Sequence, residues 1–291
     1  MKTHHKINTL ILAVTVLVLL TSGLAHADNI YVACPNSIVK LDSSGHKTAF
    51  ASNLDTPRGL AFDKSGNLYT NSNNGTVYKL NSSGSRTTFA TGTSGSDWYP
   101  YGLAFDSSGN LYQAHNSSGI IDKFTSSGSK STFASGLGDP EGLAFDSSGY
   151  LYATSGSDGT IYKYASSGSR TTFASGLSYP EGLAFDSSGY LYVTNTNMGT
   201  IEKFDTSGHK TTFAGGLNGP GGLAFGSGGY LYVVNCWGDS IERFDSSGNK
   251  TTFASNLDYP TWGIAIQIPE PASALLIGAG ILFARLRRRQ R

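Results

Sequence analysis

Residues 140–179 read PEGLAFDSSGYLYATSGSDGTIYKYASSGSRTTFASGLSY, and near copies of this stretch follow one another along most of the 291-residue chain. Each copy opens on a proline that is followed by Gly-Leu-Ala-Phe or an equivalent segment. These prolines are Pro57, Pro100, Pro140, Pro180, Pro220 and Pro260, and the last five are 40 residues apart. A fixed period of this length is typical of proteins built from one repeated supersecondary unit.

Each repeat holds four runs of strand length, which in the quoted copy lie near residues 142–146, 150–154, 160–165 and 170–175. Asp-Ser-Ser-Gly separates the first two runs and Ser-Ser-Gly-Ser the last two, and both segments favour tight hairpin turns. There is no helical periodicity between the repeats. The sequence therefore predicts four-stranded antiparallel sheets arranged radially, which is a β-propeller.

The two ends of the repeat region complement each other. Residues 29–56 supply three strands without an inner one, and residues 263–266 supply an inner strand on its own. Joining them completes a sixth blade and removes an exposed sheet edge. We therefore predict an all-β, six-bladed propeller with a shared closing blade, whereas an open β-solenoid would need no such complementary ends.

The first 27 residues have the pattern of a signal peptide. A basic start precedes the apolar run from Ile7 to Leu20, and Ala25-His26-Ala27 has the small residues that signal peptidase requires. We expect export, a mature chain that starts at Asp28, and a propeller over residues 28–267.

Residues 268–291 form a distinct tail in which Pro269, Glu270 and Pro271 precede 13 mainly apolar residues and a cluster of arginines. The positive charge would hold this end on the cytoplasmic side of a membrane. Thirteen residues are short for a full span, so the spacing alone leaves an ordinary single-span anchor open.

The net charge of +1 hides an acidic body. Without the two lysines of the first 27 residues, the five tail arginines and Glu270, the chain keeps 14 basic and 19 acidic residues, a net charge of −5. Nucleic acid is therefore not an expected partner.

Cys34 and Cys236 follow equivalent strands of neighbouring blades, so they are a candidate disulfide in an oxidising compartment, with two free thiols as the alternative.

Two families resemble parts of this chain. The motif P-x-G-L-A-F-D-x-x-G-x-L-Y, followed by G-x-I-x-K-F, resembles the NHL repeat and the SMP-30/gluconolactonase-like propellers over residues 29–266. The Asn-His-Leu signature that names the NHL repeat is missing. The order Pro-Glu-Pro, apolar helix and arginine cluster resembles the PEP-CTERM sorting signal of Gram-negative bacteria. It implies an exosortase as partner, transient residence in the inner membrane, and delivery to the cell surface or the extracellular, exopolysaccharide-containing matrix.

One face of the predicted disc carries loops that differ from blade to blade, whereas the other carries uniform Ser-Gly turns. Variation within uniform repeats indicates a working surface. Aromatic side chains there could stack on sugars or apolar ligands, or they could only cap the channel. The ligand-binding candidates on this face are Arg58, Trp98, Tyr101, His115, Trp237 and Trp262.

A metal site is a second expectation. Glu141 and Glu181 directly follow two repeat prolines in neighbouring blades, and Asn195 or Asn235 could complete an oxygen-rich site for Ca²⁺. The resemblance to SMP-30-like enzymes implies metal ligands at this post-proline position, although asparagine or aspartate is the more usual residue there.

We therefore carry three hypotheses. The first is a non-catalytic module that binds a glycan, peptide or matrix protein. The second is a metal-dependent lactonase or lyase that uses Glu141 and Glu181. The third is a structural spacer without a concave ligand site.

Overall fold

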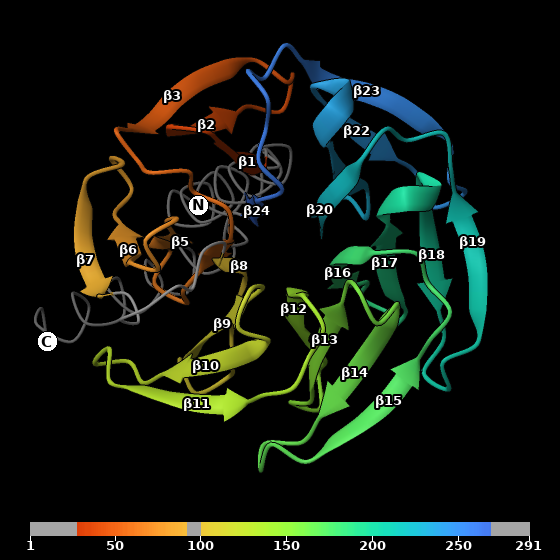
Figure 1. Ribbon diagram of the computed structural model, residues 1–291. Coiled ribbons are helices and arrows are strands. Elements are labelled where there is room, and N and C mark those ends of the chain that lie inside the picture. The colour runs from red at the N-terminus through yellow and green to blue at the C-terminus, as the bar shows by residue number, and fades with distance from the viewer. Residues whose placement is uncertain (1–27, 92–99, 269–291) are drawn as a thin grey trace, which may run out of the picture. The chain divides into compact units, whose positions relative to one another are not determined.

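The computed structural model describes residues 28–91 and 100–268, which form six four-stranded antiparallel sheets arranged as blades around a ring (Figure 1). Residues Asn29–Gln267 make one compact unit. Blade 1 consists of β4 (Leu60–Phe62), β5 (Leu68–Asn71), β6 (Val77–Leu80) and β7 (Arg86–Ala90). Blade 2 consists of β8 (Pro100–Phe105), β9 (Leu111–His115), β10 (Ile120–Phe124) and β11 (Lys130–Ala134). Blade 3 consists of β12 (Pro140–Phe145), β13 (Leu151–Ser155), β14 (Thr160–Tyr164) and β15 (Arg170–Ala174).

The remaining blades follow the same order. Blade 4 consists of β16 (Pro180–Phe185), β17 (Leu191–Asn195), β18 (Thr200–Phe204) and β19 (Lys210–Ala214). Blade 5 consists of β20 (Pro220–Phe225), β21 (Leu231–Asn235), β22 (Ser240–Phe244) and β23 (Lys250–Ser255). Two short 3-10 helices, η1 (Thr196–Met198) and η2 (Cys236–Gly238), follow β17 and β21.

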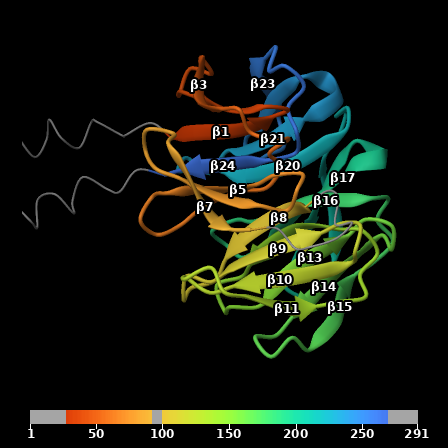
Figure 2. The ribbon, with the colours of Figure 1, turned by 60° about the vertical axis from the view of Figure 1, so that its left-hand side comes forward.

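Both ends of the repeat region build blade 6, as the sequence predicts. It consists of β24 (Ile264–Gln267), β1 (Asn29–Cys34), β2 (Ser37–Leu41) and β3 (Lys47–Ser52), in that order. The strands β24 and β1 pair antiparallel, with Asn29 opposite Gln267 and Val32 opposite Ile264, and lie side by side in Figure 2. The prediction of six blades with a shared closing blade is confirmed.

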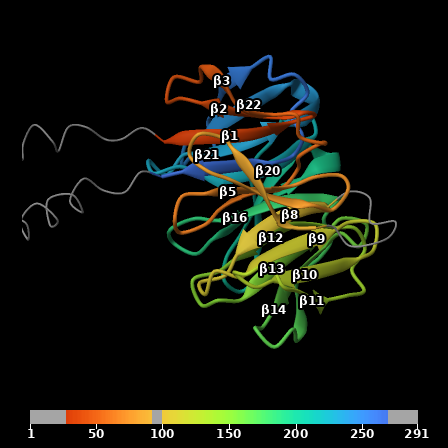
Figure 3. The same cartoon turned by 90° about the vertical axis from the view of Figure 1, so that its left-hand side faces the viewer.

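The serine-glycine turns form as expected. At the turn between β12 and β13, the Asp146 carboxylate accepts hydrogen bonds from the backbone N–H groups of Ser148 and Tyr150, and Gly149 has a φ of 85°. A positive φ is unfavourable for side chains other than glycine, which explains the Asp-x-x-Gly spacing. Figure 3 shows the inner strands lying along the ring axis, so these turns are all on one face and the variable loops are on the other.

Aromatic pairs join neighbouring blades. Tyr152 of β13 contacts Phe173 of its own blade and Phe185 of the next, with ring centroids 5.0 Å apart in both pairs and edge-to-face geometry. Equivalent tyrosines recur in every blade, and such pairs contribute about 0.5–1.5 kcal/mol each beyond the burial of their area. The core is therefore a set of layers between blades.

A ring of glycines brings the inner strands into close contact. A Cβ atom on Gly142 would overlap the carbonyl oxygen of Glu181 in the next blade, and one on Gly263 would overlap that of Arg58, where the ring closes. The same relation holds in the other four blades, at Gly59, Gly102, Gly182 and Gly222. Glycine is required here for close backbone approach, and the residue that precedes each glycine is brought to the centre of the ring.

In the part of the chain that the structure describes, no helix is long and apolar enough to cross a membrane. The signal peptide and the sorting motif of Pro269, Glu270 and Pro271 lie outside the described residues, so their expected roles stay predictions.

Candidate functional site

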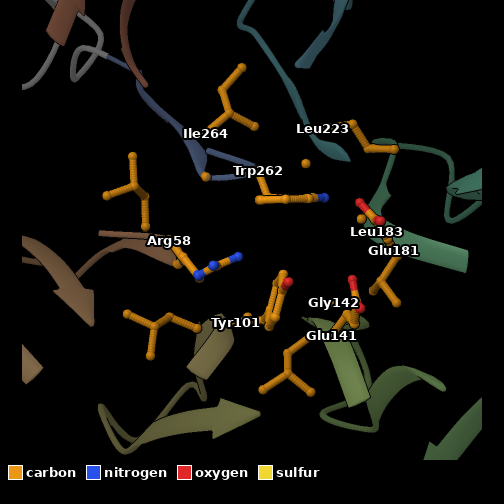
Figure 4. A pocket seen from close by; sticks show the side chains of 17 residues that line it. Arg58, Tyr101, Glu141, Gly142, Glu181, Leu183, Leu223, Trp262 and Ile264 are labelled. Carbon is orange, nitrogen blue, oxygen red and sulfur yellow. The ribbon is translucent and has the colours of Figure 1, made fainter. Parts of the chain in front are cut away.

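A cavity of about 180 Å³ lies at the centre of the ring, where the six inner strands begin (Figure 4). Each blade contributes the same three-residue register, a variable residue followed by Gly and then Leu or Ile. The variable side chains that line the cavity are Arg58, Tyr101, Glu141, Glu181 and Trp262. Blade 5 has Gly221 at this position. A scaffold with near-sixfold repetition thus carries four kinds of side chain around one pocket, including one cationic and two acidic groups.

Side chains of the second strands fix the backbone of these residues. The Thr154 hydroxyl accepts a hydrogen bond from Gly142 N–H, with an N···O distance of 2.8 Å. It donates one to the carbonyl of Glu181, with an O···O distance of 2.7 Å. Thr194 makes the equivalent bonds to Gly182 and Gly221. Because each threonine bridges two blades, the position of Glu181 is set by its neighbour as well as by its own strand.

Arg58 lies against two aromatic rings. Its guanidinium carbon is 4.7 Å from the ring centroid of Tyr101 and 5.0 Å from that of Trp262. The two rings are 5.6 Å apart and nearly perpendicular. Cation–π attraction in a desolvated site contributes about 2 kcal/mol, so the rings hold this charge at one end of the pocket.

The absence of a side chain at Gly221 leaves room for the indole of Trp262. A Cβ atom on Gly221 would come within 2.7 Å of the indole Cδ1 and 2.9 Å of the Cys236 Sγ atom. The indole therefore occupies the position that a blade 5 side chain would take, and the inserted residue Thr261 permits this by shifting Trp262 one place from its proline. The Thr261 hydroxyl donates to the carbonyl of Pro57, which ties this segment to blade 1.

Two carboxyl groups lie at the opposite end from Arg58 (Figure 4). Glu141 and Glu181 are 2% and 5% exposed. The Nδ2 atom of Asn116 donates to Glu141 Oε1 at 3.1 Å, whereas Oε2 of both glutamates has no hydrogen-bond partner among the described residues. Two buried carboxyl oxygens therefore remain available to a ligand.

Burial raises the pKa of Glu141 to about 8, against the opposing effect of hydrogen bonds from Tyr179 and Asn116 and of the Arg58 charge. The pKa of Glu181 is raised well above its usual range, first by burial and then by the charge of Glu141. Burial and the Glu141 charge also raise the pKa of the Tyr101 hydroxyl. A buried pair with these shifts keeps at least one proton at neutral pH, and a ligand that brings positive charge or N–H donors would favour loss of that proton.

The expected calcium site does not fit this geometry. The side-chain oxygen of Asn195 accepts from Ser178 N–H at 2.7 Å, and that of Asn235 accepts from Asn218 N–H at 2.6 Å. Both asparagines thus tether the loop that leads into the inner strand of their own blade, and neither lines the cavity. Ca²⁺ takes six to eight oxygen ligands. Among the described residues no three His, Cys, Asp or Glu side chains are grouped to hold a metal ion, and Arg58 places a like charge nearby.

His115 is also a structural residue and not a ligand contact. It is 1% exposed, and its Nε2 atom lies 3.1 Å from the Oδ2 atom of the buried Asp122. Burial acts to raise the pKa of Asp122, but hydrogen bonding and charge from His115 and Lys130 outweigh this effect and lower it. The sequence placed His115 in a variable loop as a ligand-binding candidate, whereas in the structure it ends β9 and its side chain contacts Asp122 of blade 2.

The aromatic candidates separate into two groups. Tyr101 and Trp262 meet in the pocket, whereas Trp237 lies outside it, 64% exposed on η2 and packed over Gly219. Trp98 lies outside the described residues. The pocket aromatics and the exposed loop aromatic Trp237 are therefore separate surfaces.

The structure has Cys34 and Cys236 as free thiols, in place of the disulfide expected between them. Both are buried in the same hydrophobic cluster. The Cys34 thiol donates to the carbonyl of Leu257 at 3.1 Å, so it tethers its loop as Asn235 does in blade 5. Burial raises the pKa of Cys34 to about 11 and that of Cys236 to about 12.

Sequence reasoning did not pair Asn116 or Tyr179 with Glu141. Asn116 follows the second strand of blade 2, and Tyr179 precedes the inner strand of blade 4, on either side of the blade that carries Glu141. These contacts could in principle be predicted, because loops of adjacent blades meet around each inner strand on the variable face. Predicting them requires the number of blades and their order around the ring.

Comparison with known proteins supports the fold and does not show a family. No protein-family model matches the chain, and no curated protein sequence matches it. The resemblance to NHL and SMP-30-like repeats and to PEP-CTERM tails therefore stays a prediction.

Solved structures with the same fold include lyases and a nidogen–laminin complex. A streptogramin B lyase matches with a TM-score of 0.64 and 17% identity, over 79% of this chain and 80% of that one. A catalytically inactive virginiamycin B lyase from Staphylococcus aureus with quinupristin matches with a TM-score of 0.60 and 20% identity, over 70% and 72%. A chain of a nidogen–laminin complex matches with a TM-score of 0.73 and 21% identity, over 82% and 98%. At these identities the comparisons establish the propeller fold alone.

Proposed function

We propose that the protein is a non-catalytic binding propeller of the cell surface or extracellular matrix, which takes a terminal sugar residue of a glycan into the central pocket. The observation that carries this proposal is the combination of two aromatic rings, two carboxyl groups and a guanidinium in one cavity of about 180 Å³. Aromatic faces stack on sugar rings, and carboxylates and arginine bond to hydroxyl groups. The nidogen–laminin complex is a precedent for binding by a chain of this fold.

The export that we expect from the sequence supports a ligand of this kind. A signal peptide at residues 1–27 and a sorting tail at residues 268–291 would take the propeller past the inner membrane, where polysaccharides are abundant. The pocket is too small for a folded protein domain, so a protein partner would use the exposed loops around Trp237 instead.

The experiment compares pocket and rim directly. Binding of the purified protein to a panel of bacterial polysaccharides and monosaccharides is measured by calorimetry, alongside the variants Tyr101→Ala and Trp237→Ala. We expect Tyr101→Ala to weaken sugar binding at least tenfold and Trp237→Ala, an exposed residue of the same face, to leave it unchanged. The opposite pattern would move the site to the loops and overturn the assignment to the pocket.

A second candidate is a lyase or lactonase that uses Glu141 as a general base. It is favoured by a carboxyl pKa near neutral, which suits proton transfer at pH 7, and by the lyases among the structures of similar fold. Incubation with quinupristin and a set of simple lactones, followed by mass spectrometry, tests it. Turnover of one of these compounds that is lost in Glu141→Gln would replace the binding hypothesis. If the protein binds sugar stoichiometrically but turns over none of these compounds at the same concentration, they are excluded as substrates.

A further inference from the structure

The charges in the central pocket do not balance when both glutamates are ionised. Among the residues that the structure describes, Arg58 is the one cationic residue that lines it, and it faces two carboxyl groups. Both Glu141 and Glu181 are more than nine-tenths buried, and each has an Oε2 atom without a hydrogen-bond partner among the described residues. Leaving such buried atoms unsatisfied is unfavourable, and more so when the group is charged. A ligand with one positive charge and several N–H donors would remove this cost.

The chemistry of the donors selects among cations. A divalent ion needs more oxygen ligands than the two carboxyls and the Tyr101 hydroxyl supply. A quaternary ammonium has no N–H groups to offer the two Oε2 atoms. A primary ammonium is compact and carries three donors, so one group can satisfy both glutamates and keep a third donor for the Tyr101 hydroxyl.

The walls of the pocket define the rest of the ligand. The half-buried rings of Tyr101 and Trp262 lie between the carboxyl end and Arg58, and the cavity holds about one six-membered ring with its substituents (Figure 4). Aromatic walls suit the faces of a sugar, and the guanidinium suits hydroxyl groups at the far end. We propose that the bound residue is an amino sugar with a free primary ammonium, a hexosamine, whose ammonium lies between Glu141 and Glu181. This inference rests on the proposed sugar-binding function.

Binding should release a proton. Burial and mutual repulsion keep one proton on the pair at neutral pH, and an ammonium placed between the two carboxyls favours the state in which both are ionised. The other charged or titratable groups that face the pair are Arg58, Tyr101, Asp139, Tyr179 and Cys236. Titration at pH 6.5 in two buffers of different ionisation enthalpy measures the protons released per ligand.

The test compares glucosamine with three ligands: N-acetylglucosamine, whose nitrogen is uncharged, glucose, which has no nitrogen, and cyclohexylamine, which keeps the ammonium and lacks the sugar hydroxyl groups. We expect glucosamine to bind at least tenfold more tightly than glucose or N-acetylglucosamine, with release of about one proton. In Glu141→Gln or Glu181→Gln this preference should fall at least tenfold. Each amide keeps the shape of the side chain and removes a charge that is costly to bury, so these variants fold. Glu202→Gln is the matched control, because Glu202 is equally buried and lies outside the pocket.

The outcomes separate this inference from the proposed function. Equal affinity for glucose and glucosamine, lost in Tyr101→Ala, would overturn the ammonium assignment and leave sugar binding in place. Binding of cyclohexylamine without any sugar would overturn both proposals. Both proposals would also be overturned if the protein bound none of the four ligands and none of the polysaccharides in the panel.

Discussion

Replacing Glu141 by glutamine should make the protein more stable at alkaline pH, although the residue is buried and lines the candidate site. The native carboxyl has a pKa of about 8, whereas an ordinary glutamate titrates near 4.5. Between these values folding requires Glu141 to hold a proton that the unfolded chain has released, so the free energy of unfolding falls as the pH rises. Each pH unit in this window costs about 1.4 kcal/mol, which amounts to about 3–5 kcal/mol at pH 9.

The glutamine variant lacks this cost. Its amide oxygen can still accept the hydrogen bond from Asn116, so the two proteins should have similar stability at pH 5. Removing the Glu141 charge also lowers the pKa of Glu181 toward its usual range, while burial keeps it raised. We therefore expect the variant to retain part of the pH dependence and to exceed the wild type by about 3–5 kcal/mol at pH 9.

Urea unfolding at pH 5, 7 and 9, followed by tryptophan fluorescence, provides the measurement. Glu202→Gln is the contrast, because Thr200 and Thr212 donate to the Glu202 carboxylate at 2.7 and 3.0 Å. The same substitution there should destabilise the protein at pH 7 by about 1–3 kcal/mol. Parallel pH curves for the wild type and Glu141→Gln, or a wild type that is the more stable at pH 9, would refute the assignment of a raised pKa to Glu141.

Three further predictions follow from the ring. Gly142→Ala would drive a methyl group into the Glu181 carbonyl, so we expect unfolding experiments to show a loss of more than about 3 kcal/mol. Gly149→Ser, in the turn between β12 and β13 where the added Cβ has open space, should cost only about 1–2 kcal/mol. Thr194→Val should cost about 1–3 kcal/mol because it leaves Gly182 N–H and the Gly221 carbonyl unbonded, and the natural Val234 at the equivalent place in blade 5 shows that a valine side chain fits this position. Cys34 and Cys236 should not react with a thiol reagent until the protein unfolds, since both are buried with a raised pKa; fast labelling of either in the native state would contradict this arrangement.

The repeat made the fold predictable because period, turn residues and hydrophobic runs all indicate the same structure. The 40-residue spacing set the number of blades, and the unmatched runs at residues 29–56 and 263–266 indicated how the ring closes. The position of Glu141 and Glu181 at the centre followed from the same register. These are properties of the backbone, and the same sequence pattern for them recurs in each repeat.

The contacts of individual side chains were not predictable in the same way. Asn195, Asn235, Cys34 and His115 occupy equivalent positions at the end of second strands, and the sequence offered them as ligands or a disulfide. In the structure, Asn195, Asn235 and Cys34 bond to the loop that leads into their own blade, whereas His115 pairs with Asp122. A residue that ends a strand beside a bending loop finds unsatisfied backbone groups close by, and the local bond is favoured over a distant ligand. A pattern of residue types cannot distinguish these two uses.

The distribution of variation in the repeats now has a physical explanation. The glycine of each inner strand is fixed by the carbonyl of the next blade, and the leucine or isoleucine after it packs between blades, so neither position can change without opening the ring. The residue before the glycine contributes its carbonyl to that contact, while its side chain enters the central cavity, where it meets no repeated partner. Chemistry can therefore differ there at little cost to the fold. Arginine, tyrosine, two glutamates, glycine and a displaced tryptophan at six equivalent places are what a symmetric scaffold with an asymmetric ligand would require.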